Sequence, residues 1–327
     1  MIHTPVCDLL QIEHPIVLGG MAAGHTSAPL VAAVSHAGAL GTIGLAGLPA
    51  DAVRATLATL HDTVHKPFAA NFLLFLAQDE SFTAALEHPP AVLSFAWARP
   101  QQALAPYFER AHAAGAKVMY MAPSVPEAVR AAKAGADVIV AQGSEGGGHV
   151  GWMGTLPLVP MVIDAVAPLP VLAAGGIADG RGLAAALALG AQGVLLGTRF
   201  LATSEAPIPE RFKAAIVQSD GHDTVLSEIP DVASGLVWPG AMARTARNGF
   251  IARWAGREWA LREQQAQAAK QLAQARKDAD ADNAILYYGQ DAGLIADIPP
   301  AGQVVQRMVE QAAAILGRRL PEALRQG

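Results

Sequence analysis

Residues 15 to 200 alternate between short apolar segments and segments of helical character, and this alternation limits the possible folds more than any other feature of the chain. The apolar segments are hydrophobic nearly throughout, which is typical of parallel strands buried on both faces. Eight strands that alternate with helices close naturally into a TIM, or (β/α)8, barrel. The sequence therefore predicts this α/β fold, with strands at residues 15–20, 39–44, 67–74, 92–97, 117–122, 137–143, 170–176 and 193–200.

The segments between these strands carry the signals with which helices begin and end. Residues 28–36 have apolar side chains at helical spacing and stop just before Gly38. Residues 126–134 begin with a proline, which suits the first turn of a helix, and stop at Gly135. Both segments fit the outer helices of a barrel.

The character of the chain changes after Phe200. A proline-containing stretch at residues 206–209 leads to a charged, helix-prone region from residue 244 to about residue 280. Residues 303–320 place apolar side chains on one face, as expected of a helix that closes the barrel. We therefore predict a barrel made of residues 1–205 and 300–327, and a mainly helical insertion after strand eight, at residues 206–299, that covers the substrate.

Composition excludes several classes of partner. The 327 residues carry a formal net charge of -5, with no run of lysine or arginine, so we expect neither nucleic acid nor a membrane as a partner. No segment has eighteen uninterrupted apolar residues. Cys7 is the single cysteine, and the first residues do not form a basic region followed by an apolar one. These features favour a cytoplasmic location.

A glycine-dense loop follows the strand predicted at residues 137–143. Gly146, Gly147 and Gly148 remove three side chains where the backbone would approach a bound molecule, and His149 follows directly. This arrangement indicates a ligand-binding loop with His149 directed at the ligand. Glu145 is placed either to orient His149 or to face solvent.

Two glycine-rich turns end the last two predicted strands. Gly175 and Gly176 follow strand seven, and Gly197 and Thr198 follow strand eight. These turns lie side by side in a barrel, where backbone N–H groups and the start of a short helix form a phosphate site. The alternative is that such glycines only terminate strands, but two adjacent turns favour the phosphate site.

The ends of strands one and three supply a flat surface and an amide. Gly20, Met21 and Ala22 follow strand one, and a flat cofactor can rest against this backbone. Asn71 ends strand three and offers both a donor and an acceptor, which suits a heterocycle with alternating C=O and N–H groups. A turn-forming role for Asn71 stays open. No sequence motif for a metal site is present.

Taken together, these motifs resemble the nitronate monooxygenases, formerly called 2-nitropropane dioxygenases. The motifs are also shared by the flavin-dependent enoyl-acyl-carrier-protein reductases. The resemblance covers about residues 5–205 and resumes at residues 288–295. It rests on Gly20 and Met21, on Asn71, and on residues 146–149, 174–180 and 197–200.

The resemblance implies FMN, with its phosphate on the turns at Gly175, Gly176, Gly197 and Thr198 and its isoalloxazine near Gly20, Met21 and Asn71. His149 matches a position beside the reactive edge of the flavin. Tyr288 and Gln290 match a motif that approaches the substrate in related enzymes, although packing is an alternative role for this segment. Some members have a lysine at the end of strand five and an aspartate at the end of strand six. This chain has Met121 and Gln142 near those ends, and Gln142 can still form hydrogen bonds to the cofactor, without charge.

The function expected from these features is FMN-dependent oxidation of a small alkyl nitronate by dioxygen, with His149 as the catalytic residue. The alternative is an NAD(P)H-dependent flavin reductase that acts on a quinone or an enoyl thioester. A barrel that binds a phosphate ligand without catalysing a reaction is a further alternative. A homodimer stays open as the oligomeric state.

Overall fold

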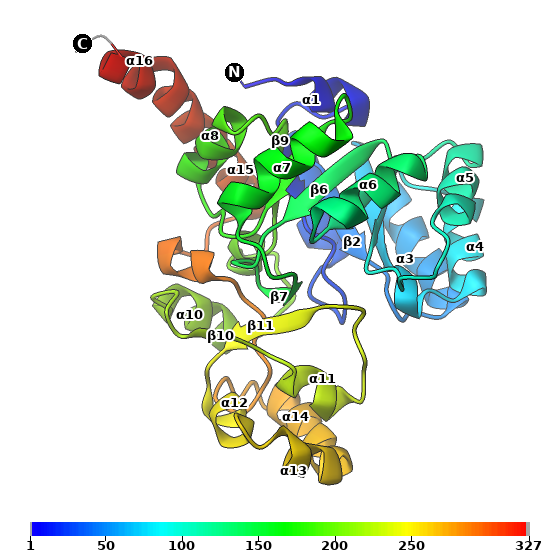
Figure 1. Cartoon of the computed structure of the whole chain (residues 1–327), viewed down its shortest axis with the longest axis vertical. Coiled ribbons are helices and arrows are strands. Elements are labelled where there is room, and N and C mark those ends of the chain that lie inside the picture. The colour runs from blue at the N-terminus through cyan, green and yellow to red at the C-terminus, as the bar shows by residue number, and fades with distance from the viewer. Residues whose placement is uncertain (1, 325–327) are drawn as a thin grey trace.

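The computed structural model describes residues 2–324, and its main element is a closed parallel sheet (Figure 1). Its strands follow one another in the order β1-β9-β8-β6-β5-β4-β3-β2. A bridge between Val17 and Leu40 joins the two ends of this order, and the Leu18 N–H donates to the Leu40 carbonyl at 2.8 Å. The predicted TIM barrel is confirmed. Its strands are β1 (Ile16–Leu18), β2 (Gly41–Gly44), β3 (Phe68–Leu73), β4 (Val92–Ala96), β5 (Lys117–Ala122), β6 (Val138–Gln142), β8 (Val171–Ala174) and β9 (Gly193–Leu196).

Helices surround this sheet and cover its outer face (Figure 1). Ser27 and Ser124 cap two of them, because each side chain accepts a hydrogen bond from the backbone N–H three residues later. The last long helix packs against α8 and α2 and so completes the ring. The helices are α2 (Ala28–His36), α3 (Ala50–Thr63), α4 (Asp79–Glu87), α5 (Ala105–Ala113), α6 (Val125–Lys133), α7 (Thr155–Val166), α8 (Gly180–Ala188), the short α9 (Thr198–Leu201) and α15 (Ala301–Ala314), with a 3-10 turn η1 (Leu74–Leu76).

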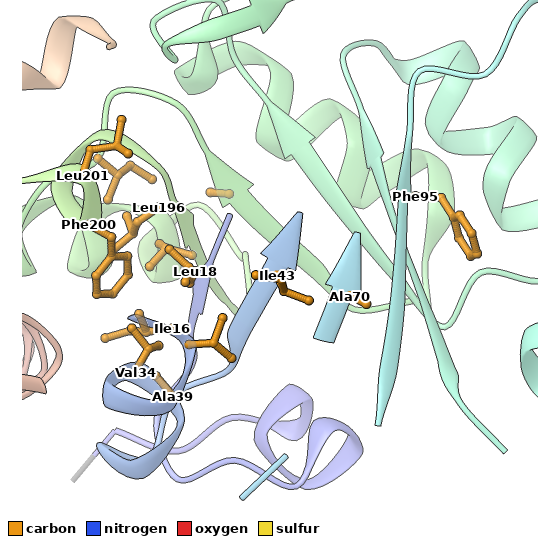
Figure 2. Packing of buried hydrophobic residues seen from close by; sticks show 14 of the residues in the cluster. Ile16, Leu18, Val34, Ala39, Ile43, Ala70, Phe95, Leu196, Phe200 and Leu201 are labelled. Carbon is orange, nitrogen blue, oxygen red and sulfur yellow. The ribbon is translucent and has the colours of Figure 1, made fainter. Parts of the chain in front are cut away.

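The strands are buried on both faces, and alternate side chains enter two different cores. Ile16 and Leu18 of β1 point outward, where they lie near Val34 of α2 and Phe200 of α9 (Figure 2). Val17 belongs to the second core, inside the barrel. Helix α1 (Pro5–Leu10) contributes Val6, Cys7 and Leu10 to this inner core. The opposite, carboxyl end of the strands is the end at which TIM barrels place their sites.

Residues 206–299 form a separate layer beside the barrel, and α1 (Pro5–Leu10) and α16 (Leu320–Leu324) lie at the far end of the molecule from it (Figure 1). This segment also contains two strands that the sequence did not predict. β10 (Thr224–Ser227) pairs with β11 (Met242–Ala246), which pairs with β7 (Gly148–Val150), a short strand between β6 and α7 that is not part of the barrel sheet. Its helices are α10 (Glu210–Gln218), α11 (Ile229–Ser234), α12 (Gly249–Trp254), α13 (Glu258–Glu263) and α14 (Gln265–Lys277), followed by η2 (Gln290–Leu294).

The two unpredicted strands are short, and their pairing is decided by distant contacts. β11 lies between β7 and β10, so that a short strand from the segment between β6 and α7 stabilises two strands of residues 206–299. A small apolar core of Ile229, Phe250, Trp254 and Leu261 holds the helices of this segment together. After α15 the chain continues as a π-helical turn, Ile315–Arg319, and α16 (Leu320–Leu324). Within residues 2–324, no helix combines the length and the apolar character that crossing a bilayer requires.

Candidate functional site

A cavity of about 390 Å3 lies at the carboxyl end of the barrel strands. Its walls come from both the barrel and residues 206–299. The cavity contains every residue that the sequence assigned to catalysis or to cofactor binding: Gly20, Met21, Ala22, Asn71, Gln142, Gly147, Gly148, His149, Gly175, Gly176, Gly197 and Thr198. The sequence therefore located the walls that the barrel contributes. The other walls include Asp231, Leu236 and Tyr287, which the sequence did not indicate, and Trp238, which the sequence named for the shape of the pocket but could not place.

The two glycine turns offer backbone donors to the cavity. Gly175 and Gly176 have φ angles of +95° and +74°, a region that favours glycine. A Cβ atom on Gly175 would lie 2.7 Å from the Gly143 carbonyl oxygen. Within residues 2–324, no backbone carbonyl accepts a hydrogen bond from the N–H groups of Gly176, Gly197 or Thr198. Unpaired N–H groups grouped in this way form a site for a phosphate or another anion.

The rim beside these turns suits a flat heterocycle. Gly20 packs so closely on Asn71 that a Cβ atom would lie 2.2 Å from the Asn71 Cβ. The Asn71 amide donates to the Gly20 carbonyl at 3.1 Å, inside β3, so this residue is not a turn former. Gln142 is only 9% exposed, and its Oε1 has no hydrogen-bond partner among the described residues. A buried amide oxygen without a partner is costly, and a bound N–H donor would satisfy it.

His149 lies in β7 and is held by two residues of the insertion. Its Nε2 is 2.8 Å from the Asp231 carboxylate, and both side chains are largely buried. Its ring stacks on Trp238, with centroids 3.4 Å apart and planes 8° apart. The pairing of Ala243 with His149 fixes the backbone of β7 against β11. His149 therefore lies in a paired strand on the wall of the cavity, rather than in the loop that the sequence predicted.

Glu145 has neither of the two roles expected for it. Its carboxylate accepts hydrogen bonds from the Thr155 N–H and hydroxyl, each at 2.9 Å, at the start of α7. The Thr155 hydroxyl also lies 2.9 Å from the Gly175 carbonyl oxygen. Glu145 thus ties the glycine-rich loop to the neighbouring turn. The residue that orients His149 is Asp231, which lies 82 positions later in the chain.

Tyr288 and Gln290 do not line the cavity, which corrects the placement expected from the sequence. The Tyr288 side chain is buried, and its hydroxyl donates to Asp223 at 2.9 Å. Gln290 is exposed and contributes its backbone N–H to the Glu145 carbonyl at 2.9 Å. Their neighbours Tyr287 and Asp291 line the cavity instead. The sequence indicated that this segment lies near the cavity, but it did not show which of its side chains face the cavity.

Asp291 is the acidic residue on the wall near Thr198. It is 4% exposed, and its Oδ1 has no hydrogen-bond partner among residues 2–324. Burial raises the pKa of this carboxyl to about 7, although Thr198 and the charge of Arg199 act in the opposite direction. This carboxyl can therefore be neutral near physiological pH, beside donors that bind anions.

His25 is a second histidine on the cavity wall that the sequence reasoning did not single out. Its Nδ1 lies 2.7 Å from the Ala22 carbonyl, so Nδ1 donates and Nε2 is an acceptor. Burial lowers its pKa, which keeps the ring neutral. Among residues 2–324 there is no group of three or more His, Cys, Asp or Glu side chains suited to a metal ion.

The fold and the site define a class of protein: a TIM barrel whose cavity has unpaired backbone donors, a flat rim and a largely buried histidine side chain. The sequence matches the family model for nitronate monooxygenase over residues 3–85 and 79–311. The chain therefore belongs to the nitronate monooxygenase family, whose members are oxidoreductases, and this membership implies a flavin cofactor.

Two relatives and one solved structure show how this chain is related to known proteins. A (3aS,4S,5R,7aS)-5-hydroxy-7a-methyl-1-oxo-octahydro-1H-indene-4-carboxyl-CoA dehydrogenase of Mycobacterium tuberculosis is 40% identical over 229 residues, which are 69% of this chain and 63% of that protein. A probable nitronate monooxygenase of Staphylococcus saprophyticus is 35% identical, over 76% of this chain and 79% of that protein. The structure of FabK from Thermotoga maritima superposes with a TM-score of 0.88 at 34% identity, and covers 98% of this chain and 100% of that one.

Proposed function

We propose that this protein is an FMN-dependent enzyme that oxidises small alkyl nitronates, such as propionate 3-nitronate, with dioxygen. The observation that carries the proposal is the composition of one cavity. Unpaired N–H groups for a phosphate, a flat rim with two amides, and the pair of His149 and Asp231 all line it. The family and the relative from Staphylococcus saprophyticus support the same reaction. The proposal includes a cytoplasmic location, and a homodimer as one possible oligomeric state.

The residues present fit FMN. Its phosphate would take the N–H groups of Gly176, Gly197 and Thr198, and its ring would lie against Gly20 and Met21. Asn71 and the unpaired Oε1 of Gln142 would form hydrogen bonds with the edge of this ring. FMN supplies the electron transfer between substrate and oxidant. The protein therefore binds and orients the cofactor and the substrate, and supplies the electrostatic environment around them. Residues 1–205 and 300–327 would hold the cofactor, and residues 206–299 would cover the substrate.

The proposed role of His149 follows from how its ring is held. Nε2 faces the Asp231 carboxylate, which leaves Nδ1 without a hydrogen-bond partner among the described residues. Nδ1 is therefore the nitrogen that can accept a hydrogen bond or a proton from a bound molecule when the ring is neutral. When the ring is charged, Nδ1–H stabilises a bound anion. Trp238 covers one face of the ring and restricts its rotation.

A second function is favoured by one comparison. The relative from Mycobacterium tuberculosis is named as a dehydrogenase of a carboxyl-CoA compound, which is a thioester. The alternative proposal is an NAD(P)H-dependent flavin reductase that acts on an enoyl thioester or a quinone. Leu73, Leu76, Trp97 and Leu236 give the cavity an apolar wall that suits either substrate. The two proposals differ in the electron donor.

An anaerobic titration distinguishes these functions. The FMN-loaded protein is mixed without oxygen with ethylnitronate, and separately with NADH or NADPH, while the flavin absorbance is followed. We expect the nitronate to bleach the flavin and the nicotinamides to leave it oxidised. Rapid bleaching by NADH or NADPH alone would assign the protein to the reductases. A protein that binds no flavin, or whose flavin reacts with neither donor, would exclude both proposals.

A further inference from the structure

Two adjacent tyrosines in the segment after α14 use their hydroxyl groups differently. Tyr288 donates to Asp223 at 2.9 Å, away from the cavity. Tyr287 lines the cavity, and its hydroxyl forms no hydrogen bond within residues 2–324. Tyr287 is half-buried, and a tyrosine packed among other side chains normally finds a partner for its O–H group. The free hydroxyl of Tyr287 is therefore available to a ligand in the cavity.

The surroundings of Tyr287 prepare it to donate a proton in a hydrogen bond. Its ring lies between two histidines, with ring centroids 6.1 Å from His149 and 6.2 Å from His25. Burial, followed by the charge of Asp231, raises the pKa of Tyr287 well above its ordinary value, while Arg276 acts in the opposite direction. The phenol therefore keeps its proton at any working pH. It offers a neutral, rigid donor that needs no change of protonation.

We propose that the Tyr287 hydroxyl is the hydrogen-bond donor that binds an oxygen atom of the anionic substrate, next to His149. This assignment rests on the proposed function, because it concerns the same cavity, and it adds a further catalytic residue and the class of group that it recognises. The recognised group is a planar anion with two oxygens, as in a nitronate. Its other contact would be Nδ1 of His149, whose Nε2 is occupied by Asp231.

The two histidines alone cannot replace this donor. Burial keeps His25 neutral, and its Nδ1 donates to the Ala22 carbonyl. Its free Nε2 is therefore an acceptor, and the lone pair of this nitrogen would repel a bound anion. His149 offers a donor at Nδ1 only when its ring is protonated. Tyr287 is therefore a donor on this wall that does not depend on pH, as is the indole N–H of Trp238, which is buried and has no partner among the described residues. A hydrogen bond to a charged group is stronger than one between neutral groups.

The test compares Tyr287→Phe with Tyr288→Phe in the FMN-loaded protein. The two substitutions each remove one hydroxyl from neighbouring residues, but only one hydroxyl is free in the cavity. The probe is sodium propionate, an unreactive planar anion with the same heavy-atom skeleton as ethylnitronate. Its Kd is measured by the change in flavin absorbance, and the Kd of FMN is measured for each variant by fluorescence quenching.

We expect Tyr287→Phe to weaken propionate binding by about tenfold or more, the loss typical of a hydrogen bond to a charged group. The kcat/KM for ethylnitronate should fall by at least the same factor, while the Kd of FMN stays unchanged. Tyr288→Phe should leave propionate binding as in the wild type. Equal propionate affinity in the wild type and Tyr287→Phe, or no binding to the wild type, would overturn the inference.

The outcome of the propionate test is independent of the outcome of the anaerobic titration that tests the proposed function. If ethylnitronate fails to reduce the wild-type flavin, nitronate oxidation is excluded, yet the propionate comparison still decides whether Tyr287 binds an anion. If the nitronate reduces the flavin and Tyr287→Phe binds propionate like the wild type, the function stands and the assignment of Tyr287 fails.

Discussion

Replacing Asp291 by asparagine should make the stability of the protein depend less on pH. Asparagine has nearly the same shape as aspartate but does not ionise. Asp291 is 4% exposed and its Oδ1 has no partner among the described residues, so its charged form is poorly solvated. Its pKa in the folded protein is about 7, against an ordinary value of 3.8. The folded protein therefore holds this proton more tightly than the unfolded chain does.

The sign and size of the effect follow from this difference in pKa. Below about pH 4 the carboxyl is protonated in both states, and it costs no stability. Between about pH 4 and pH 7 the unfolded chain releases the proton first, so the folded state loses stability as pH rises. Three pKa units correspond to about 4 kcal/mol as an upper limit, of which about 2.5 kcal/mol falls between pH 5 and pH 8.

The assay is urea unfolding of the flavin-free wild type and of Asp291→Asn, at pH 5 and at pH 8. All other titrating groups are common to the two proteins, so the difference between their pH slopes isolates Asp291. We expect the wild type to lose up to about 2.5 kcal/mol more than the variant over this range. Equal slopes would refute the reasoning, because they would show that the Asp291 carboxyl has no raised pKa.

Three further predictions concern the cavity. His149→Ala should lower nitronate turnover about a hundredfold or more in an oxygen-uptake assay, and full turnover would remove this residue from the mechanism. Asp231→Asn should lower kcat by a smaller factor and alter the pH profile, because the residue acts through His149; an unchanged profile would make the pair purely structural. Gly175→Ala should reduce the flavin content of the purified protein, since its φ of +95° and the Gly143 oxygen 2.7 Å away disfavour a side chain. Absorbance at the flavin band measures this content, and full occupancy would contradict the role of the turn.

The barrel could be predicted because its signals are local. Each strand is a short run of residues that are apolar on both faces, and each glycine turn follows its strand directly in the sequence. Once these elements form a barrel, their carboxyl ends must meet at one end. Asn71, Gln142 and the glycines of the last two strands therefore came together as expected, and the resemblance to the nitronate monooxygenases, which rests on these motifs, is confirmed by the family match.

The wall that residues 206–299 contribute to the cavity could not be predicted, because no motif or pattern in the neighbouring sequence marks its residues. Asp231 lies in α11, an ordinary short helix by its sequence, and it becomes a partner of His149 only through the pairing of β7 with β11. That pairing joins strands of a few residues from distant parts of the chain. Trp238 likewise acquires its role by stacking on a ring that is remote in the sequence.

The sequence by itself determined the barrel, the end at which its site lies, and the glycine turns that can hold a phosphate. The tertiary structure decided which neighbour in a motif faces the cavity: Tyr287 rather than Tyr288, and Asp291 rather than Gln290. The reason is physical. Hydrophobic periodicity and glycine content are properties of a few consecutive residues, whereas the direction of one side chain in an irregular segment depends on the distant elements that pack against it.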